Sequence, residues 1–168
     1  SPRACAGVWV DDSAGRALNG TRRLGGAVAL RRVLNGGVLA ADEKVVGVLV
    51  PPAVGGALIN TALSLDHRVA VNLNYTLSPD VMNFCIRDCG IKTVLTSRAF
   101  MEKRPFETDE AELVFLEDLM EKVTGWDKLV GGIQAKLLPA GMVDKIHGLD
   151  RIDPEELLTI IFTSGSTG

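Results

Sequence analysis

The sequence predicts a layered α/β fold with a mostly parallel sheet and flanking helices. Two observations carry this prediction: apolar runs of strand length recur along the chain, and stretches of helical length lie between them. The apolar runs are continuous and do not alternate with polar residues, which is typical of parallel strands covered on both faces. With 168 residues, of which 46% are hydrophobic, the chain can bury one real core.

The elements are expected in the order strand, helix, strand, helix. At the start, "VWVDDSAGRALNG" predicts two short strands around a turn at residues 13–15. Five further strands are expected at residues 45–50, 69–73, 93–96, 113–116 and 157–162. Helices are expected at residues 21–34, where Arg31 interrupts an apolar arc, and at residues 53–65, 78–89 and 126–146.

The helix at residues 78–89 has the clearest local signals. Ser78 can cap the first backbone amides, and Pro79 suits the first helical position, where its missing N–H costs nothing. Helical spacing places four apolar residues on one face, so they are expected to pack in the core: Val81, Met82, Cys85 and Cys89.

Composition and charge exclude several classes of function. The net charge of -3 arises from mixed acidic and basic residues, so we expect no nucleic-acid partner. No apolar run reaches the length of a membrane span, and the chain starts without a methionine or a signal peptide. With three cysteines and no disulfide pattern, a cytoplasmic protein with at most peripheral membrane contact is expected. Neither His67 nor His147 has neighbours at metal-ligand spacing, so no metal site is predicted.

The last seven residues, "FTSGSTG", follow an apolar strand and predict a phosphate-binding loop. Glycines permit close approach of the backbone to a ligand, and four hydroxyl groups can donate hydrogen bonds to phosphate oxygens. Ligands of parallel sheets bind beyond the carboxyl ends of strands, where this loop is expected. The alternative is a flexible tail. The candidate phosphate-binding residues are Thr163, Ser164, Gly165, Ser166, Thr167 and Gly168.

This motif resembles the opening of the phosphate loop of the adenylate-forming, or AMP-dependent synthetase and ligase, superfamily. The resemblance implies that residues 163–168 contact the phosphates of ATP, with Mg²⁺ as a second cofactor. It implies a ligase that activates a carboxylic acid as an acyl-adenylate and transfers the acyl group to a thiol. Two other interpretations stay open: another phosphate-binding α/β enzyme, and a non-catalytic or degenerate nucleotide-binding domain.

Within the superfamily, three segments resemble the acyl-acyl-carrier-protein synthetase part of the bacterial bifunctional 2-acylglycerophosphoethanolamine acyltransferase. They are "NYT" at 74–76, "IKTVLTSRAFMEK" at 91–103 and "LVFLEDL" at 113–119. This resemblance implies a fatty-acid substrate, acyl carrier protein or coenzyme A as acceptor, and a location at the inner face of the bacterial inner membrane.

The resemblance also implies that the chain is incomplete. The superfamily motif continues with one residue and then Pro-Lys-Gly, and the residues for magnesium, ribose and catalysis lie later still. Residues 1–168 are therefore expected to be a partial N-terminal subdomain of an adenylation domain, truncated within the phosphate loop and inactive alone. An incomplete sheet leaves an open edge, so the fragment is expected to be poorly soluble.

Overall fold

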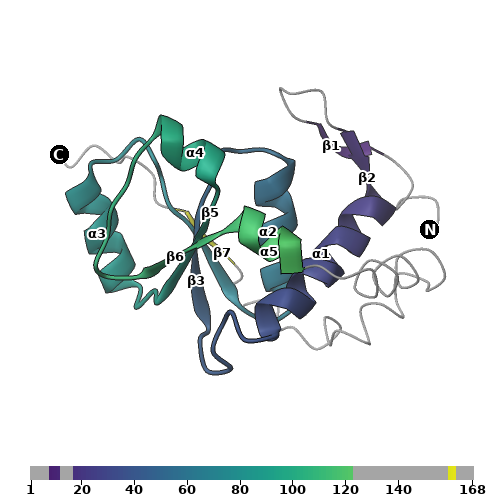
Figure 1. The fold of residues 1–168 in the computed structure, drawn as a ribbon, viewed down its shortest axis with the longest axis horizontal. Helices are drawn as coiled ribbons and strands as arrows, with labels where there is room; N and C mark the ends of the chain where they lie inside the picture. Colours follow the sequence, from purple (N-terminus) through teal and green to yellow (C-terminus); the bar gives the residue numbers. More distant parts are fainter. Residues whose placement is uncertain (1–7, 12–16, 123–158, 162–168) are drawn as a thin grey trace.

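A parallel sheet forms the centre of the fold (Figure 1). The structure is a computed structural model that describes residues 8–11, 17–122 and 159–161. Within these residues the sheet consists of β3 (Val45–Leu49), β4 (Val69–Asn72), β5 (Thr93–Thr96), β6 (Glu112–Phe115) and β7 (Thr159–Ile161). Their spatial order is β6-β5-β3-β4-β7, and every described pairing is parallel. The predicted fold class is confirmed.

Helices cover both faces of the sheet. On one face lie α1 (Gly20–Asn35), α2 (Val54–Ser64) and α5 (Leu116–Lys122), and on the other lie α3 (Pro79–Asp88) and α4 (Arg98–Lys103) (Figure 1). Successive strand residues alternate between two apolar clusters: Val48 packs with α1 and α2, whereas Leu49 packs with α3 and α4. This two-sided burial explains why the strands read as continuous apolar runs.

The middle of the sheet requires a glycine. A Cβ atom on Gly47 would lie 2.8 Å from the Cγ2 atom of Val94 and 3.2 Å from that of Ile91. Both contacts are closer than packed carbon atoms allow, so the Val94 side chain of β5 and the Ile91 side chain in the turn after α3 sit closer to β3 than a larger residue at position 47 would permit.

A small antiparallel pair precedes α1. It consists of β1 (Val8–Asp11) and β2 (Ala17–Asn19), as the sequence predicts, while the turn between them lies outside the described residues.

Most predicted elements are confirmed, with shifts of one or two residues at their ends. The strand expected at 113–116 lies at 112–115, and it ends one residue earlier because Leu116 already begins α5. Neither α4 nor α5 was predicted. The helix predicted at 126–146 lies outside the described residues.

The predicted start of α3 is confirmed, but its apolar face is partly wrong. The Ser78 side chain accepts a hydrogen bond from the Val81 amide, and Pro79 is the first helical residue. Met82 and Cys85 are buried, whereas Val81 is 44% exposed. The buried stripe runs through Met82, Cys85 and Ile86, which leaves Val81 at its solvent-facing border.

No helix within the described ranges is both long and apolar enough to cross a membrane.

Candidate functional site

The carboxyl ends of all the described parallel strands meet at one edge of the sheet. Leu49 of β3 is in register with Thr96 of β5, which is in register with Phe115 of β6. On the other side, Asn72 of β4 is in register with Ile161 of β7. Segments that follow these strands therefore share one surface, which we call the carboxyl edge.

The predicted phosphate loop follows β7 at this edge. Residues 163–168 lie outside the described residues, so the structure describes β7 up to Ile161, two residues before the predicted loop. The Thr159–Ile161 strand pairs with the last part of β4, so β7 ends beside Asn72 at this edge. The apolar run that predicted this strand is thus correct in type and direction.

A network of side-chain hydrogen bonds joins β7 to β4 and α2. The amides of Asn60 and Asn72 exchange two hydrogen bonds, of 3.1 and 3.0 Å. Asn72 Nδ2 also donates to Thr159 Oγ1 at 2.9 Å, and that hydroxyl donates to the Ala70 carbonyl at 2.9 Å. The network therefore connects a helix with two neighbouring strands directly before the predicted loop.

The segment after β4 turns sharply at the carboxyl edge. The Asn74 side-chain oxygen accepts hydrogen bonds from the amide and the hydroxyl of Thr76, at 3.0 and 2.7 Å. This is an Asx turn, in which a side chain replaces a backbone acceptor. It places Tyr75 at the edge, where its ring meets the Phe100 ring edge to face at a centroid distance of 5.5 Å.

A cavity of about 360 Å³ opens beside Tyr75. The guanidinium carbon of Arg104 lies 6.0 Å from the centre of the Tyr75 ring, and the exposed Lys103 lines the same cavity. Neither cation forms an ion pair with a described residue. Two cations beside aromatic rings suit an anionic ligand that carries a planar group. The cavity is lined by Pro51, Tyr75, Ser97, Ala99, Phe100, Lys103 and Arg104.

These cations lie at the end of the short helix α4, where Lys103 is the last residue and Arg104 follows it, and contacts fix the start of this helix. Ser97 Oγ accepts from the Phe100 amide at 3.3 Å, and the Glu117 carboxylate accepts from the Arg98 amide at 3.0 and 3.1 Å. The Arg98 guanidinium lies 4.8 Å from the centre of the Phe115 ring. It also bonds Asp118 at 2.7 Å, and the hydrogen bond from this guanidinium holds the pKa of Asp118 below its usual range.

The opposite, amino-terminal edge holds a closed polar network. Arg68, which is 6% exposed, donates to Asp66 Oδ2 at 2.6 Å, to Asn35 Oδ1 at 3.2 Å, and to the carbonyls of Ala40 and Glu43. Asp66 also accepts from Arg31 at 3.0 Å. Burial raises the pKa of Asp66, but the hydrogen bonds from Arg68, Asn35 and Arg31 outweigh it, so the pKa lies below its ordinary value.

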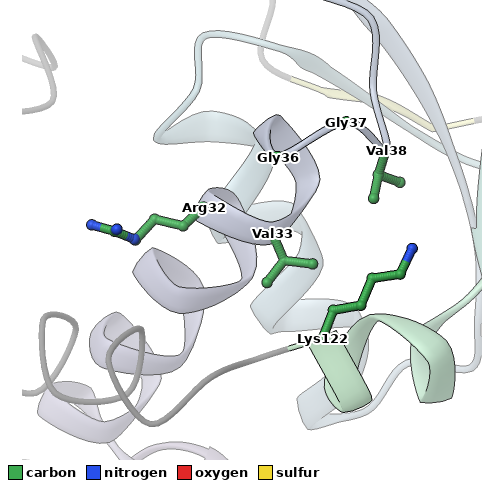
Figure 2. Close-up of a pocket in the computed structure, with 6 residues that line it drawn as sticks. All are labelled: Arg32, Val33, Gly36, Gly37, Val38 and Lys122. Carbon is green, nitrogen blue, oxygen red and sulfur yellow. The ribbon is translucent and has the colours of Figure 1, made fainter.

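A further cavity of about 280 Å³ lies between the end of α1 and α5 (Figure 2). Figure 2 shows the Arg32 and Lys122 side chains pointing in different directions, so these cations do not converge on one ligand group. This cavity is lined by Arg32, Val33, Gly36, Gly37, Val38 and Lys122.

The cysteines of α3 do not form a nucleophilic site. Burial raises the pKa of both the Cys85 and the Cys89 thiol, and the neighbouring Asp88 carboxylate adds to each shift. Their predicted packing role fits this environment, since Cys85 is buried and Cys89 is half-buried. Among the described residues, no three His, Cys, Asp or Glu side chains form a group that could hold a metal ion.

Sequence reasoning predicted a phosphate loop at residues 163–168, which lie outside the described residues, and missed the rest of the carboxyl edge. Asn60, Asn72 and Thr159 are far apart in the chain, and no local pattern connects them. The serine at position 97, three residues before Phe100, is the one local signal that could have indicated α4 and hence the cavity.

The chain is similar to known proteins in both sequence and fold. Residues 27–168 match the family described as AMP-binding enzyme. The fold is similar to that of VinN in complex with 3-methylaspartate, with 19% identity and a TM-score of 0.70 over 96% of this chain and 41% of that chain.

Two further solved structures are similar. For O-succinylbenzoate coenzyme A synthetase (MenE) from Bacillus subtilis in complex with AMP, the identity is 16% and the TM-score 0.61, over 95% of this chain and 35% of that one. For the N-terminal domain of FACL13 from Mycobacterium tuberculosis, the values are 18% and 0.56, over 69% and 31%. At such identities the likeness is one of fold, and the chain spans less than half the length of each of these proteins.

Proposed function

Because the chain belongs to the AMP-binding enzyme family, whose members form adenylates, we propose that residues 1–168 are the N-terminal part of the adenylation domain of an acid–thiol ligase. The observation that carries this proposal is that "FTSGSTG" directly follows β7 in the sequence, and that β7 ends at the carboxyl edge of a parallel sheet. In this proposal, Thr163, Ser164, Gly165, Ser166, Thr167 and Gly168 hold the phosphates of ATP through backbone amides and hydroxyls.

The proposed reaction has two steps. A carboxylate oxygen of the acid attacks the α-phosphorus of ATP, and the bond from that phosphorus to the bridging oxygen breaks, which releases pyrophosphate. The sulfur of a thiol then attacks the acyl carbon, and AMP leaves with the electron pair of the broken carbon–oxygen bond. Phosphate-binding groups favour the first step because they stabilise the charge on the departing pyrophosphate.

We propose a fatty acid as the acid, and acyl carrier protein or coenzyme A as the thiol. The resemblance of residues 91–103 and 113–119 to acyl-acyl-carrier-protein synthetases supports this choice. Both acceptors carry phosphate groups, and Lys103 and Arg104 give the carboxyl edge a cationic cavity of about 360 Å³ in which such a group would fit. A cytoplasmic location at the inner face of a bacterial membrane would suit the same substrates.

Magnesium is proposed as the metal that accompanies ATP. Hard cations of this kind prefer oxygen ligands such as carboxylates. Among the described residues, no three His, Cys, Asp or Glu side chains form a group that could hold this ion. We propose that its protein ligands lie outside the described ranges.

The test is carboxylate-dependent exchange of labelled pyrophosphate into ATP by the full-length protein, with fatty acids of several chain lengths. Exchange that requires a fatty acid would support the proposal. Exchange with another class of acid would keep the ligase and reject the fatty acid. ATP binding without exchange would favour a non-catalytic nucleotide-binding domain, and phosphoryl transfer without acid activation would favour another phosphate-binding enzyme.

A further inference from the structure

We propose that Asn72, held by Asn60, is a positioning residue that sets the place of the phosphate loop through Thr159. This inference rests on the proposed function, because it concerns how that loop is held. Asn60 and Asn72 act through a strand and do not touch the ligand.

The directions of the hydrogen bonds fix the orientation of the Asn72 amide. Asn72 Nδ2 donates to both Asn60 Oδ1 and Thr159 Oγ1, so its two amide hydrogens are used. Its Oδ1 atom accepts from Asn60 Nδ2 at 3.1 Å. Since Thr159 Oγ1 gives its own hydrogen to the Ala70 carbonyl, it is an acceptor toward Asn72. Rotating the Asn72 amide by half a turn would put two acceptors face to face, so the network fixes one orientation.

Asn60 anchors the network on α2. Asn60 Nδ2 also donates to the Gly56 carbonyl at 2.9 Å, one turn earlier in the same helix. Gly56 is buried, and a Cβ atom there would lie 3.2 Å from the Val50 side chain. The Asn60 amide is therefore tied to a closely packed part of α2, and it passes this constraint on to Asn72.

The strand β7 is itself weakly held. In the described structure this strand has three residues and one neighbour, β4, and Thr159 is exposed. A slip by one residue would move the strand by about 3.3 Å and turn each side chain to the other face. Thr159 is in register with Ala70, and only this register keeps its hydroxyl between the Ala70 carbonyl and the Asn72 amide.

The network of Asn60, Asn72 and Thr159 therefore fixes the register in which β7 pairs with β4. The predicted loop begins four residues after Thr159, so an error in the placement of β7 passes directly to the groups that would hold phosphate. A polar network on a face that α2 otherwise covers with apolar residues also specifies one pairing, because any slip leaves its members unpaired.

The test uses two substitutions at one position in the full-length protein. Thr159→Val removes the hydroxyl and keeps the shape, whereas Thr159→Ser keeps the hydroxyl. We expect Thr159→Val to raise the KM for ATP by about three- to tenfold in the exchange assay, because removing the hydroxyl loses its hydrogen bonds with Asn72 and the Ala70 carbonyl. The KM for the carboxylic acid should stay close to its wild-type value, and Thr159→Ser should behave as wild type.

Two further variants sharpen this test. Asn72→Ala should reproduce the rise in the KM for ATP, and the double variant with Thr159→Val should show no further rise, because both changes remove the same bond. Thr61→Val is the matched control, since the Thr61 hydroxyl bonds the Ala57 carbonyl within α2 and contacts neither strand through that bond.

An unchanged KM for ATP in Thr159→Val would overturn the inference, as would equal rises in the KM of ATP and acid. If wild-type protein shows no exchange, the proposed function fails, and equilibrium dialysis with ATP then decides the inference. Weaker ATP binding by Thr159→Val but not by Thr159→Ser would support it. Equal binding by all variants, or no ATP binding by wild type, would overturn it.

Discussion

The two edges of the central sheet use their charged side chains differently. At the amino-terminal edge, Arg68 is almost fully buried and every one of its nitrogens donates to Asp66, to Asn35 or to a backbone carbonyl. At the carboxyl edge, Lys103 and Arg104 are exposed, line a cavity, and form no ion pair with the described residues. The charged side chains at the amino-terminal edge are paired within the fold, whereas those at the carboxyl edge are available for a ligand.

The difference has a physical origin. A buried guanidinium must satisfy its donors within the protein, because the cost of leaving a buried charge unpaired is several kcal/mol. Exposed cations keep their hydration and can exchange it for a ligand. Changes at the amino-terminal edge should therefore affect stability, and changes at the carboxyl edge should affect binding.

The largest expected effect is that of Arg68→Met. This substitution keeps the apolar stem but leaves Asp66 with only Arg31 and Asn35 as partners, so the free energy of unfolding should fall by about 3 kcal/mol. Urea denaturation measures the loss. Lys92→Met is the control, because the Lys92–Asp42 pair is 65% and 78% exposed and should contribute little to stability. Equal losses in both variants would contradict the comparison.

Acidification should weaken the same network less than Arg68→Met does, because a neutral Asp66 carboxyl can still form hydrogen bonds. The pKa of Asp66 is lower in the folded than in the unfolded chain, where it is about 3.9. Its ionisation therefore stabilises the fold above that value, and this contribution is lost as the pH falls through the folded pKa. Denaturation curves between neutral pH and pH values below about 4 should show the loss. Asp66→Asn should flatten this part of the profile, and an unchanged slope would count against the assignment.

The double substitution Lys103→Gln with Arg104→Gln should weaken the binding of a phosphate-bearing ligand to the cavity beside Tyr75. We expect a rise of about tenfold in the KM for coenzyme A, or about 1.4 kcal/mol, with little change in thermal stability. The control is Lys122→Gln, which removes a cation from the cavity in Figure 2. An unchanged KM, or the same rise in the control, would show that the cavity does not bind this acceptor.

The smallest effects are expected at the start of α4. Ser97→Ala removes a helix cap and should lower the free energy of unfolding by about 1 kcal/mol. Glu117→Gln removes the charge but keeps an oxygen that can accept from the Arg98 amide, so about 0.5 kcal/mol is expected. Thermal melts of both variants test this order, and the reverse order would mean that the carboxylate is the main cap.

Sequence patterns predicted the helices and strands that are specified by residues close together in the chain. The five apolar runs are strands, of which β3, β4 and β5 in the middle of the described sheet are buried on both faces, and Ser78 with Pro79 specified the start of α3. In contrast, α4 and α5 have six and seven residues, too few for a helical period to stand out. The start of α4 depends partly on Glu117, which lies on another element, so no pattern near residues 98–103 contains that information.

The candidate site divides in the same way. The strand before the proposed phosphate loop could be predicted because its apolar run is one continuous segment, and the loop itself stays a prediction. The cavity could not, because Pro51, Tyr75 and Phe100 follow three different strands and meet only when the sheet forms. Val81 was misassigned because it lies next to the buried stripe of α3 in helical spacing, but it is 44% exposed at the border of that stripe.

The pairing of β4 with β7 also has a consequence for the order of folding. Thr159 bonds a carbonyl 89 residues earlier in the chain, whereas β5 and β6 close over a much shorter segment. Bringing distant segments together costs more chain entropy, so β7 is expected to join the sheet after β3, β4, β5 and β6 have assembled. Within the described sheet, the edge beside the proposed phosphate loop would then form last, and a nascent chain would assemble most of the described core before that edge is complete.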